Sequence, residues 1–247
     1  MNIEITDLTR RFGRTRAVDG VDLRTGTGVF GLLGPNGAGK TSLLRMLATV
    51  IPPSSGSMRL LDLDPARHGP RREIRRRLGY LPQNLGYYPG FTVVEFVEYF
   101  ALLKEMPPRE VPRAVAAAVE RVGLGDRAKA KLRTLSGGML RRAGIAQAIV
   151  NEPRLLLFDE PTAGLDPEQR VEFRSLLREL GRTSTVVVST HLVEDVGAAC
   201  AEVALMHQGR IAFQGTPDEL VARGAGHGTG DAPLERGYSA VLAAVRV

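Results

Sequence analysis

The chain has 247 residues, of which 43% are hydrophobic and 24% are charged, and its formal net charge is +6. These values are typical of a globular chain of one or two domains, and they exclude collagen-like, low-complexity and wholly disordered proteins. The mild positive charge permits an anionic partner but does not indicate which kind. Every apolar run is far shorter than the roughly 18 residues that cross a bilayer. The first ten residues include Glu4 and Asp7 and no apolar stretch, so we expect no signal peptide and a cytoplasmic location.

The N-terminal segment predicts strands, then a loop and a helix. Apolar and polar residues alternate over Ile3–Ile5 and Val21–Leu23, as they do in strands with one buried face. Val29–Leu33 is a short apolar run typical of a strand buried on both faces. Leucines at helical spacing predict a helix over Ser42–Val50, ended by Ile51-Pro52-Pro53.

The middle of the chain predicts an all-helical insert. Thr92 and Glu95 form the capping-box pattern that opens a helix, and Glu110–Val122 is rich in alanine and valine at helical spacing. No strand signal interrupts Thr92–Ile149. We therefore expect a helical subdomain over about residues 90–150.

Strand signals return after the insert. Apolar or β-branched runs occur at Leu155–Phe158, Thr185–Ser189 and Glu202–Met206. A helix between the first two begins at Asp166-Pro167, an N-cap residue followed by proline at the first helical position. This alternation predicts a mostly parallel sheet.

Composition near the C-terminus suggests where the main domain ends. Residues 223–231 are glycine-rich and predict a linker, and residues 232–247 predict a short helix. The main domain is therefore expected to span residues 1–222.

A glycine-rich loop follows the buried strand at Val29–Leu33 and carries the phosphate-binding pattern G-x-x-x-x-G-K-[ST]. Its glycines allow backbone N–H groups to turn toward phosphate oxygens, and the following helix N-terminus adds its dipole. In this pattern the lysine reaches the β- and γ-phosphates and the threonine hydroxyl binds Mg²⁺. The predicted nucleotide-binding residues are Gly34, Pro35, Asn36, Gly37, Ala38, Gly39, Lys40, Thr41 and Ser42.

The sequence argues against two other kinds of nucleotide-binding site. Gly26–Gly31 matches G-x-G-x-x-G, but that fingerprint follows a strand and opens a helix, whereas this one precedes a strand. A GTPase would need an Asn-Lys-x-Asp base-reading motif, which the sequence lacks. We therefore predict an α/β P-loop NTPase with a mostly parallel core sheet, N-terminal antiparallel strands and an inserted α-helical subdomain.

Two acidic residues end the apolar run Leu155–Phe158. A P-loop site needs a carboxylate for Mg²⁺ at the end of a second buried strand, and Asp159 is placed to supply it. Glu160 is the candidate general base that polarises the attacking water.

Leu135-Ser136-Gly137-Gly138-Met139, together with the P-loop and the Asp159-Glu160 strand end, resembles the ATP-binding subunit of ABC transporters. The resemblance runs from Ile3 to about Leu220, and Gly164-Leu165-Asp166 matches the D-loop of that family. It implies that Phe12 stacks on adenine, that Gln83 touches Mg²⁺ and senses nucleotide, and that His191 contacts the γ-phosphate.

The resemblance also implies cofactors and an assembly. ATP and Mg²⁺ are the expected ligands, with Thr41, Gln83 and Asp159 toward the metal and with Glu160, His191 and Gln83 as catalytic residues. Two chains would pack head to tail, so that each ATP lies between the P-loop of one chain and Ser136, Gly137 and Gly138 of the other. The second copy is either the same chain or a homologous ATPase.

Position 139 is methionine, where many family members have glutamine. In this respect the chain resembles the branch of two-gene exporters, in which a separate permease carries the membrane helices. The resemblance therefore implies an ATPase held at the inner face of the membrane by a permease. Seven of the 13 Phe and Tyr residues fall between residues 80 and 100. They are either local core or a socket for the permease, and the family resemblance favours the socket for Tyr87, Tyr88 and Phe91.

One alternative function stays open: a soluble ABC ATPase that acts on ribosomes or DNA. The basic run Arg71–Arg77 is the one feature that favours it, although a solvated helix face explains the run more simply. Ribosome-type members usually carry two nucleotide-binding domains, and DNA-repair members carry long insertions. Neither feature is present, so we expect no nucleic-acid partner.

Overall fold

The computed structural model describes residues 1–226 and 229–245. The strands are β1 Ile3–Phe12, β2 Thr15–Thr25, β3 Gly28–Leu33, β4 Ser55–Leu60, β5 Leu78–Leu81, β6 Leu155–Asp159, β7 Thr185–Thr190, β8 Glu202–His207 and β9 Arg210–Gly215. The α-helices are α1 Lys40–Leu47, α2 His68–Arg76, α3 Val93–Leu103, α4 Val111–Arg121, α5 Gly137–Ile149, α6 Pro167–Leu180, α7 Val193–Ala199, α8 Pro217–Arg223 and α9 Pro233–Ala244. Two 3-10 helices, Gly125–Arg127 and Leu132–Thr134, connect α4 to α5.

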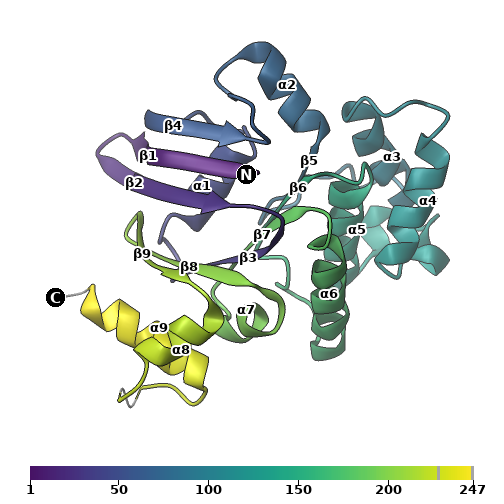
Figure 1. Cartoon of the computed structure of the whole chain (residues 1–247). Coiled ribbons are helices and arrows are strands. Elements are labelled where there is room, and N and C mark those ends of the chain that lie inside the picture. Colours follow the sequence, from purple (N-terminus) through teal and green to yellow (C-terminus); the bar gives the residue numbers. More distant parts are fainter. Residues whose placement is uncertain (227–228, 246–247) are drawn as a thin grey trace.

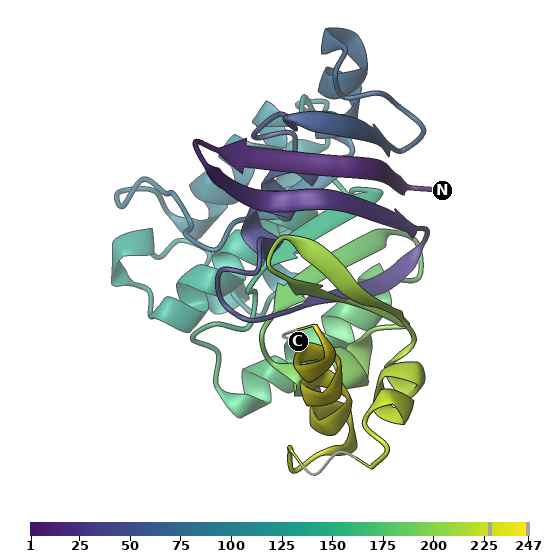
Figure 2. The same ribbon diagram turned by 90° about the vertical axis from the view of Figure 1, so that its left-hand side faces the viewer.

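The N-terminal strands form the predicted antiparallel sheet, with strand order β2-β1-β4 (Figure 1). Ile5 of the central strand lies opposite Leu23 on one side and Met58 on the other. Ile3 and Ile5 are buried, as the alternating pattern predicts. This face of the sheet packs against α1 and the core sheet, and Figure 2 shows the sheet in front of the other layers.

A six-stranded sheet with the order β5-β6-β7-β3-β8-β9 forms the core. Five strands are parallel, and β9 returns antiparallel to β8 at one edge. The central strand β3 pairs with β7, and Val29 lies opposite Val186. The mostly parallel core sheet predicted from the sequence is therefore confirmed.

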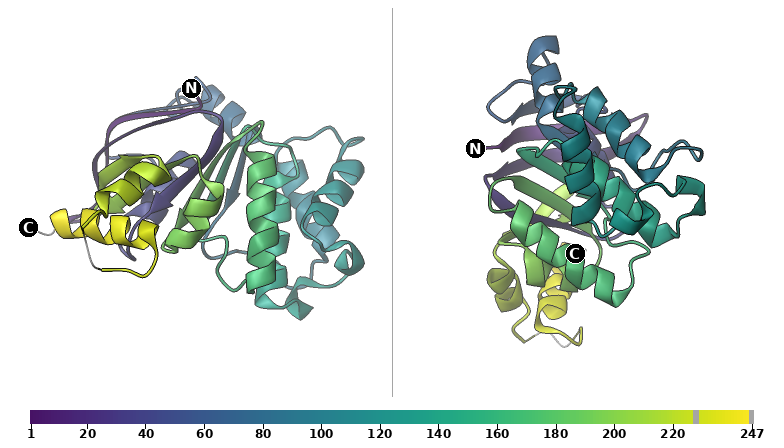
Figure 3. Two further views of the ribbon diagram at one scale, coloured as in Figure 1. Left: turned by 60° about the horizontal axis from the view of Figure 1, so that its bottom comes forward. Right: turned by 90° about the vertical axis from the view of Figure 1, so that its right-hand side faces the viewer.

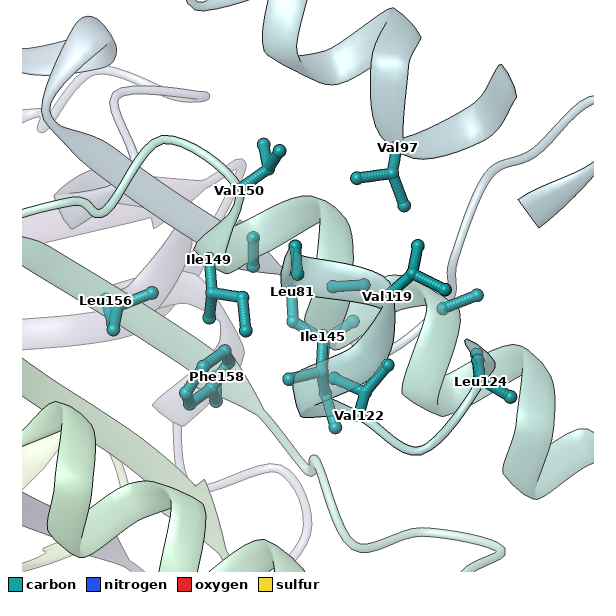
Figure 4. Close-up of a cluster of buried hydrophobic side chains, with 14 of the residues drawn as sticks. Leu81, Val97, Val119, Val122, Leu124, Ile145, Ile149, Val150, Leu156 and Phe158 are labelled. Carbon is teal, nitrogen blue, oxygen red and sulfur yellow. The ribbon is translucent and has the colours of Figure 1, made fainter. Parts of the chain in front are cut away.

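The predicted helical insert is also confirmed, and it lies to one side of the core sheet (Figure 3). α3 opens with the capping box: Thr92 Oγ1 accepts from the Glu95 N–H, and the Glu95 carboxylate accepts from the Thr92 N–H. Figure 4 shows Ile145 and Ile149 of α5 beside Phe158 of β6, with Val119 of α4 farther from that strand. This buried cluster joins the insert to the strand that ends at Asp159.

The bounds of α1 differ from the prediction. The helix covers Lys40–Leu47, whereas leucine spacing predicted Ser42–Val50. It begins earlier because Gly39, in the left-handed region with φ 105°, serves as its N-cap. It ends earlier because Thr49 also adopts a left-handed backbone, with φ 57°, before the prolines are reached.

The last two helices pack against one edge of the core. α8 and α9 lie together, and Val241 and Leu242 of α9 join a buried cluster with Leu33, Val203 and Leu205. The predicted linker over 223–231 includes residues 227–228, and the predicted helix over 232–247 includes 246–247; both pairs lie outside the described residues. The division of the chain at residues 222 and 231 remains a prediction. Among the described residues, no helix is both long and apolar enough to cross a membrane.

Candidate nucleotide-binding site

The loop between β3 and α1 is shaped by glycines at positions that exclude a side chain. Gly34 has φ 153°, and a Cβ atom there would lie 2.3 Å from the Met206 carbonyl oxygen. Gly39 has φ 105°, and its Cβ atom would lie 2.1 Å from the Ala17 carbonyl oxygen. The loop is therefore held tightly against β2 and β8, while Asn36 and Gly37 at its tip are exposed. Thr41 and Ser42 follow in the first turn of α1.

Lys40 is buried beneath this loop. Its Nζ donates to the Gly34 carbonyl at 2.6 Å and to the Pro35 carbonyl at 3.1 Å. The same atom lies 3.8 Å from Glu160 Oε1. Burial lowers the pKa of Lys40, and the nearby charges of Glu160 and Asp159 oppose that shift. The ammonium group is thus placed between the loop and the end of β6.

Asp159 is fully buried at the C-terminal end of β6. Its Oδ1 accepts a hydrogen bond from the Ser189 hydroxyl of β7 at 2.5 Å. Its Oδ2 is buried and has no hydrogen-bond partner among the described residues. Buried carboxylate oxygens normally have a partner, so Oδ2 fits a cation ligand, directly or through water.

Glu160 is held in an uncommon backbone conformation. Its φ is 50°, in the left-handed region that non-glycine residues rarely adopt, and its N–H donates to the Ser189 carbonyl at 3.1 Å. Oε2 of its carboxylate lies 3.0 Å from Nδ1 of His191. Three predicted site residues, Lys40, Glu160 and His191, therefore meet at one point.

Phe12 and Gln83 lie on separate segments from this cluster. Phe12 ends β1 with 46% of its surface exposed, and the Arg10 guanidinium carbon lies 4.7 Å from the centre of its ring. Gln83 follows β5 and is exposed. Its backbone carbonyl accepts a hydrogen bond from Arg141 at 3.0 Å.

Ser136 is the N-cap of α5, as predicted, because its hydroxyl accepts from the Met139 N–H at 3.2 Å. Ser136 and Gly137 are exposed, whereas Gly138 is buried against Gly164 and Leu165. Within the described chain, no hydrogen bond or ion pair links Ser136–Gly138 to the P-loop. The N-termini of α1 and α5 are therefore two separate places in this chain.

Two residues that the sequence reasoning missed support the site. Ser189 binds both the Asp159 side chain and the Glu160 backbone. Arg141 is buried and donates to backbone carbonyls on either side of the site. Ser189 could have been found, because it ends a predicted strand next to the strand of Asp159. Arg141 could not, because no motif pattern marks it.

These features together define a P-loop nucleotide-binding domain. The family described as ABC transporter matches residues 19–163. An uncharacterized ABC transporter ATP-binding protein of Bacillus subtilis, YxlF, is 39% identical over 189 residues, which cover 76% of this chain and 62% of that protein. The Nod factor export ATP-binding protein I of Ralstonia nicotianae is 36% identical over 226 residues, covering 91% of this chain and 70% of that protein.

A solved structure supports the same family as the sequence relatives. The dimeric structure of MJ0796, a bacterial ABC transporter cassette, superposes with a TM-score of 0.77 at 26% identity, over 87% of this chain and 98% of that one. The chain therefore belongs to the ABC transporter family, and the resemblance predicted from its motifs is confirmed. It spans 62% and 70% of the length of the two relatives named above.

Proposed function

We propose that the chain is an ATP-hydrolysing motor subunit that forms a head-to-tail dimer around two ATP molecules and drives a separate membrane permease, as an exporter. The carrying observation is the meeting of Lys40, Glu160 and His191 at the end of the core sheet. Family membership and the relative named for Nod factor export support it.

Each residue has a role that its position supports. Lys40 binds the β- and γ-phosphates, and the loop backbone over Gly34–Gly39 surrounds them. Glu160 accepts a proton from the attacking water, while His191 orients the Glu160 carboxylate and meets the γ-phosphate. Phe12 provides an exposed ring for adenine.

Magnesium would be held by Thr41, Asp159 and Gln83. Oδ2 of Asp159, which has no hydrogen-bond partner in the described part of the chain, supports this assignment, because a few oxygen ligands plus water and phosphate satisfy Mg²⁺. When bound there, the ion would neutralise charge on the transferred phosphate.

The dimer follows from the two separate anion sites. Ser136 and Gly137 are exposed at the start of α5 and make no hydrogen bond to the P-loop of their own chain, within the residues described. A γ-phosphate can use both sites when a second chain supplies one of them, in a two-fold arrangement.

The permease surface is proposed at the aromatic cluster after Gln83. Tyr88 is 61% exposed, and its ring lies 5.1 Å from Phe91 and 6.3 Å from Tyr99. Phe96 of the same sequence region is buried, so the aromatic residues divide between core and surface. Exposed clustered aromatics are typical of interface anchors. This contact would place the chain at the inner face of the membrane.

The basic run Arg71–Arg77 supports no nucleic-acid role. It lies in and just after α2, where Arg72 and Arg76 both pair with Glu105 and Arg77 pairs with Glu73. These acidic partners, Glu73 and Glu105, offset part of its charge. A solvated helix face accounts for the run, so ribosome or DNA action is the less favoured function.

The catalytic assignment is tested with Glu160→Gln. We expect hydrolysis by the purified chain to fall by about 10²–10⁴-fold, because the amide keeps the shape and loses the base. ATP binding should remain, and an ATP-bound dimer should accumulate in size-exclusion chromatography. Glu152→Gln is the matched control, since Glu152 also has a left-handed backbone, with φ 46°, but lies at the opposite end of β6. Turnover near the wild-type rate in Glu160→Gln would contradict the assignment.

The permease surface is tested by co-purification from membranes that contain a permease encoded beside this chain. Tyr88→Ala should reduce recovery of the complex, with ATP hydrolysis by the isolated chain within about twofold of wild type, because the ring of Tyr88 packs against Phe91 and Tyr99, which are not site residues. Val171→Ala, which removes an exposed apolar side chain from α6, is the control. Equal recovery of the two variants would place the interface elsewhere.

A further inference from the structure

Arg141 occupies a central position behind the proposed site. It lies in α5, five residues after Ser136, and only 7% of its surface is exposed. Its guanidinium has five N–H groups, and each finds a backbone carbonyl. The acceptors are the carbonyl oxygens of Pro82 at 2.8 Å, Gln83 at 3.0 Å, Glu160 at 2.6 Å, Pro161 at 3.3 Å and Asp159.

These acceptors belong to two segments that are far apart in the sequence. Pro82 and Gln83 directly follow β5, and both are bound by Nη1 of Arg141. Asp159 is the last residue of β6 and Glu160 follows it, and the carbonyls of both are bound by Nη2. One rigid, planar group therefore connects the start of α5 to the backbone on both sides of the site.

The contact with Glu160 completes the support of its backbone. The Glu160 N–H donates to Ser189, and its carbonyl accepts from Arg141. Both peptide groups of a residue with φ 50° are thus fixed by hydrogen bonds. Strained backbone persists when its surroundings determine it in this way, and here it directs the carboxylate between Lys40 and His191.

The charge of Arg141 is consistent with this position. Burial lowers the pKa of the guanidinium, and the nearby charges of Asp159 and Glu160 oppose that shift. A lysine in its place would keep the charge but lose the planar fork that binds two segments at once. Arginine at this position therefore supplies geometry as well as charge.

We propose that Arg141 is a positioning residue, which holds the Glu160 carboxylate in place for hydrolysis and ties that placement to the backbone of Pro82 and Gln83. The inference rests on the ATPase function proposed above. It predicts that movement of the segment after β5, on the side of the aromatic cluster, changes hydrolysis through Arg141.

The test compares Arg141→Lys with Arg142→Lys. Arg142 is the adjacent residue of α5 and also donates to backbone carbonyls, those of Val122 and Gly123, both at 3.3 Å, but it does not touch the site. Rates are normalised to the amount of protein that binds ATP, so partial unfolding does not count as lost activity. Arg141→Gln, which keeps an amide donor, is measured alongside, so the test does not depend on one variant folding.

We expect Arg141→Lys to lower kcat by about 100-fold, the effect of a small misplacement of a catalytic group, with KM and the Kd for ATP within about threefold of wild type. Arg142→Lys should stay within about twofold in kcat. A kcat of Arg141→Lys or of Arg141→Gln equal to that of Arg142→Lys would overturn the inference.

A double variant separates positioning from a general structural role. In single-turnover experiments, adding Arg141→Lys to Glu160→Gln should lower the rate by less than about threefold, because Arg141 acts through Glu160. A further loss of about 100-fold would mean independent roles and would overturn the inference. If Glu160→Gln hydrolyses ATP at least about 100-fold more slowly than the wild-type chain, failure of these tests removes the role of Arg141 alone. Absence of hydrolysis by the wild-type chain would overturn both proposals.

Discussion

The side chains at the end of the core sheet show how far residue motifs can be interpreted from sequence. Lys40, Asp159, Glu160 and His191 come from three separate stretches of the chain, and the structure brings them to one place. The P-loop pattern and the acidic strand end predicted Lys40, Asp159 and Glu160, whereas His191 was predicted only through the family resemblance. Arg141 was not predicted, because its partners are backbone carbonyls, which any residue at positions 82, 83 and 159–161 would supply.

The P-loop glycines differ in what they tolerate. Gly39→Ala should destabilise the fold by more than about 3 kcal/mol, since the new Cβ atom would lie 2.1 Å from the Ala17 carbonyl. Gly37→Ala has φ 81° but no atom within 4 Å of its new Cβ, so it should cost only about 1–2 kcal/mol of backbone strain. Urea unfolding of both variants measures the difference. Equal destabilisation would show that the loop moves to accommodate a side chain.

The exposed ring of Phe12 predicts a binding effect. Phe12→Ala should weaken ATP binding by about tenfold or more, because stacking on a base is worth roughly 1–3 kcal/mol. The rate at saturating ATP should change little. Phe12→Tyr, which keeps the ring, is the control, and a fluorescent ATP analogue reports Kd. If the Kd of Phe12→Ala equals that of wild type, adenine stacks on another residue.

Elements with a strong periodic pattern were predictable, and short or edge elements were not. β3, β6 and β7 are buried apolar runs, and α3 begins with a capping box. β4 reads Ser-Gly-Ser-Met-Arg-Leu, and its pairing with β1 creates the strand rather than its own propensity. The helix bounds of α1 were wrong because Gly39 and Thr49 set them through backbone conformations that leucine spacing does not report.

The junction of α2 and α3 contains a partly buried lysine. The Nζ of Lys104 donates to the carbonyls of Leu78 at 2.6 Å and Arg75 at 3.0 Å. Burial, followed by the charge of Arg75, lowers the pKa of Lys104 to about 8. The folded chain therefore loses this proton at a lower pH than the unfolded chain does.

This shift predicts a dependence of stability on pH. Between about pH 8 and 10.4 the unfolded state binds more protons at Lys104 than the folded state, so the free energy of unfolding rises with pH. Relative to Lys104→Met, the wild type should gain up to about 3 kcal/mol across that window and nothing below it. Urea unfolding at pH 7 and pH 10 measures it. The exposed Lys129→Met is the control, and a pH-independent difference for Lys104→Met would contradict the shift.

At the scale of the whole molecule, sharing of sites between two chains is the main expectation. Lys40→Ala removes the phosphate-binding ammonium, and Ser136→Arg blocks the exposed start of α5. Each variant alone should be inactive as a homodimer. When they are mixed, one composite site of the heterodimer carries both changes and the other carries neither. ATP hydrolysis should then return to at most about a quarter of wild type under random equal mixing.

Coupling between the two sites would prevent that recovery, so a second measurement accompanies the first. Cysteines placed at Ser136 and at Asn36, an exposed P-loop residue, should cross-link between chains when ATP is present, in a background without Cys200. The same protein without ATP is the control. If activity does not return and no cross-link forms, the head-to-tail arrangement is wrong.

The order of strands in the core sheet also bears on how the chain folds during synthesis. The sheet β2-β1-β4 is complete once Leu60 has been made. β3, in contrast, pairs with β7 and β8, and Val186 follows its partner Val29 by 157 residues. At about 5–20 residues per second, the apolar strand Gly28–Leu33 spends roughly 8–30 s on the ribosome without its partner strands. During that interval the nascent chain exposes an apolar strand with unpaired backbone edges. We therefore expect chaperones to bind this strand before the nucleotide site has formed.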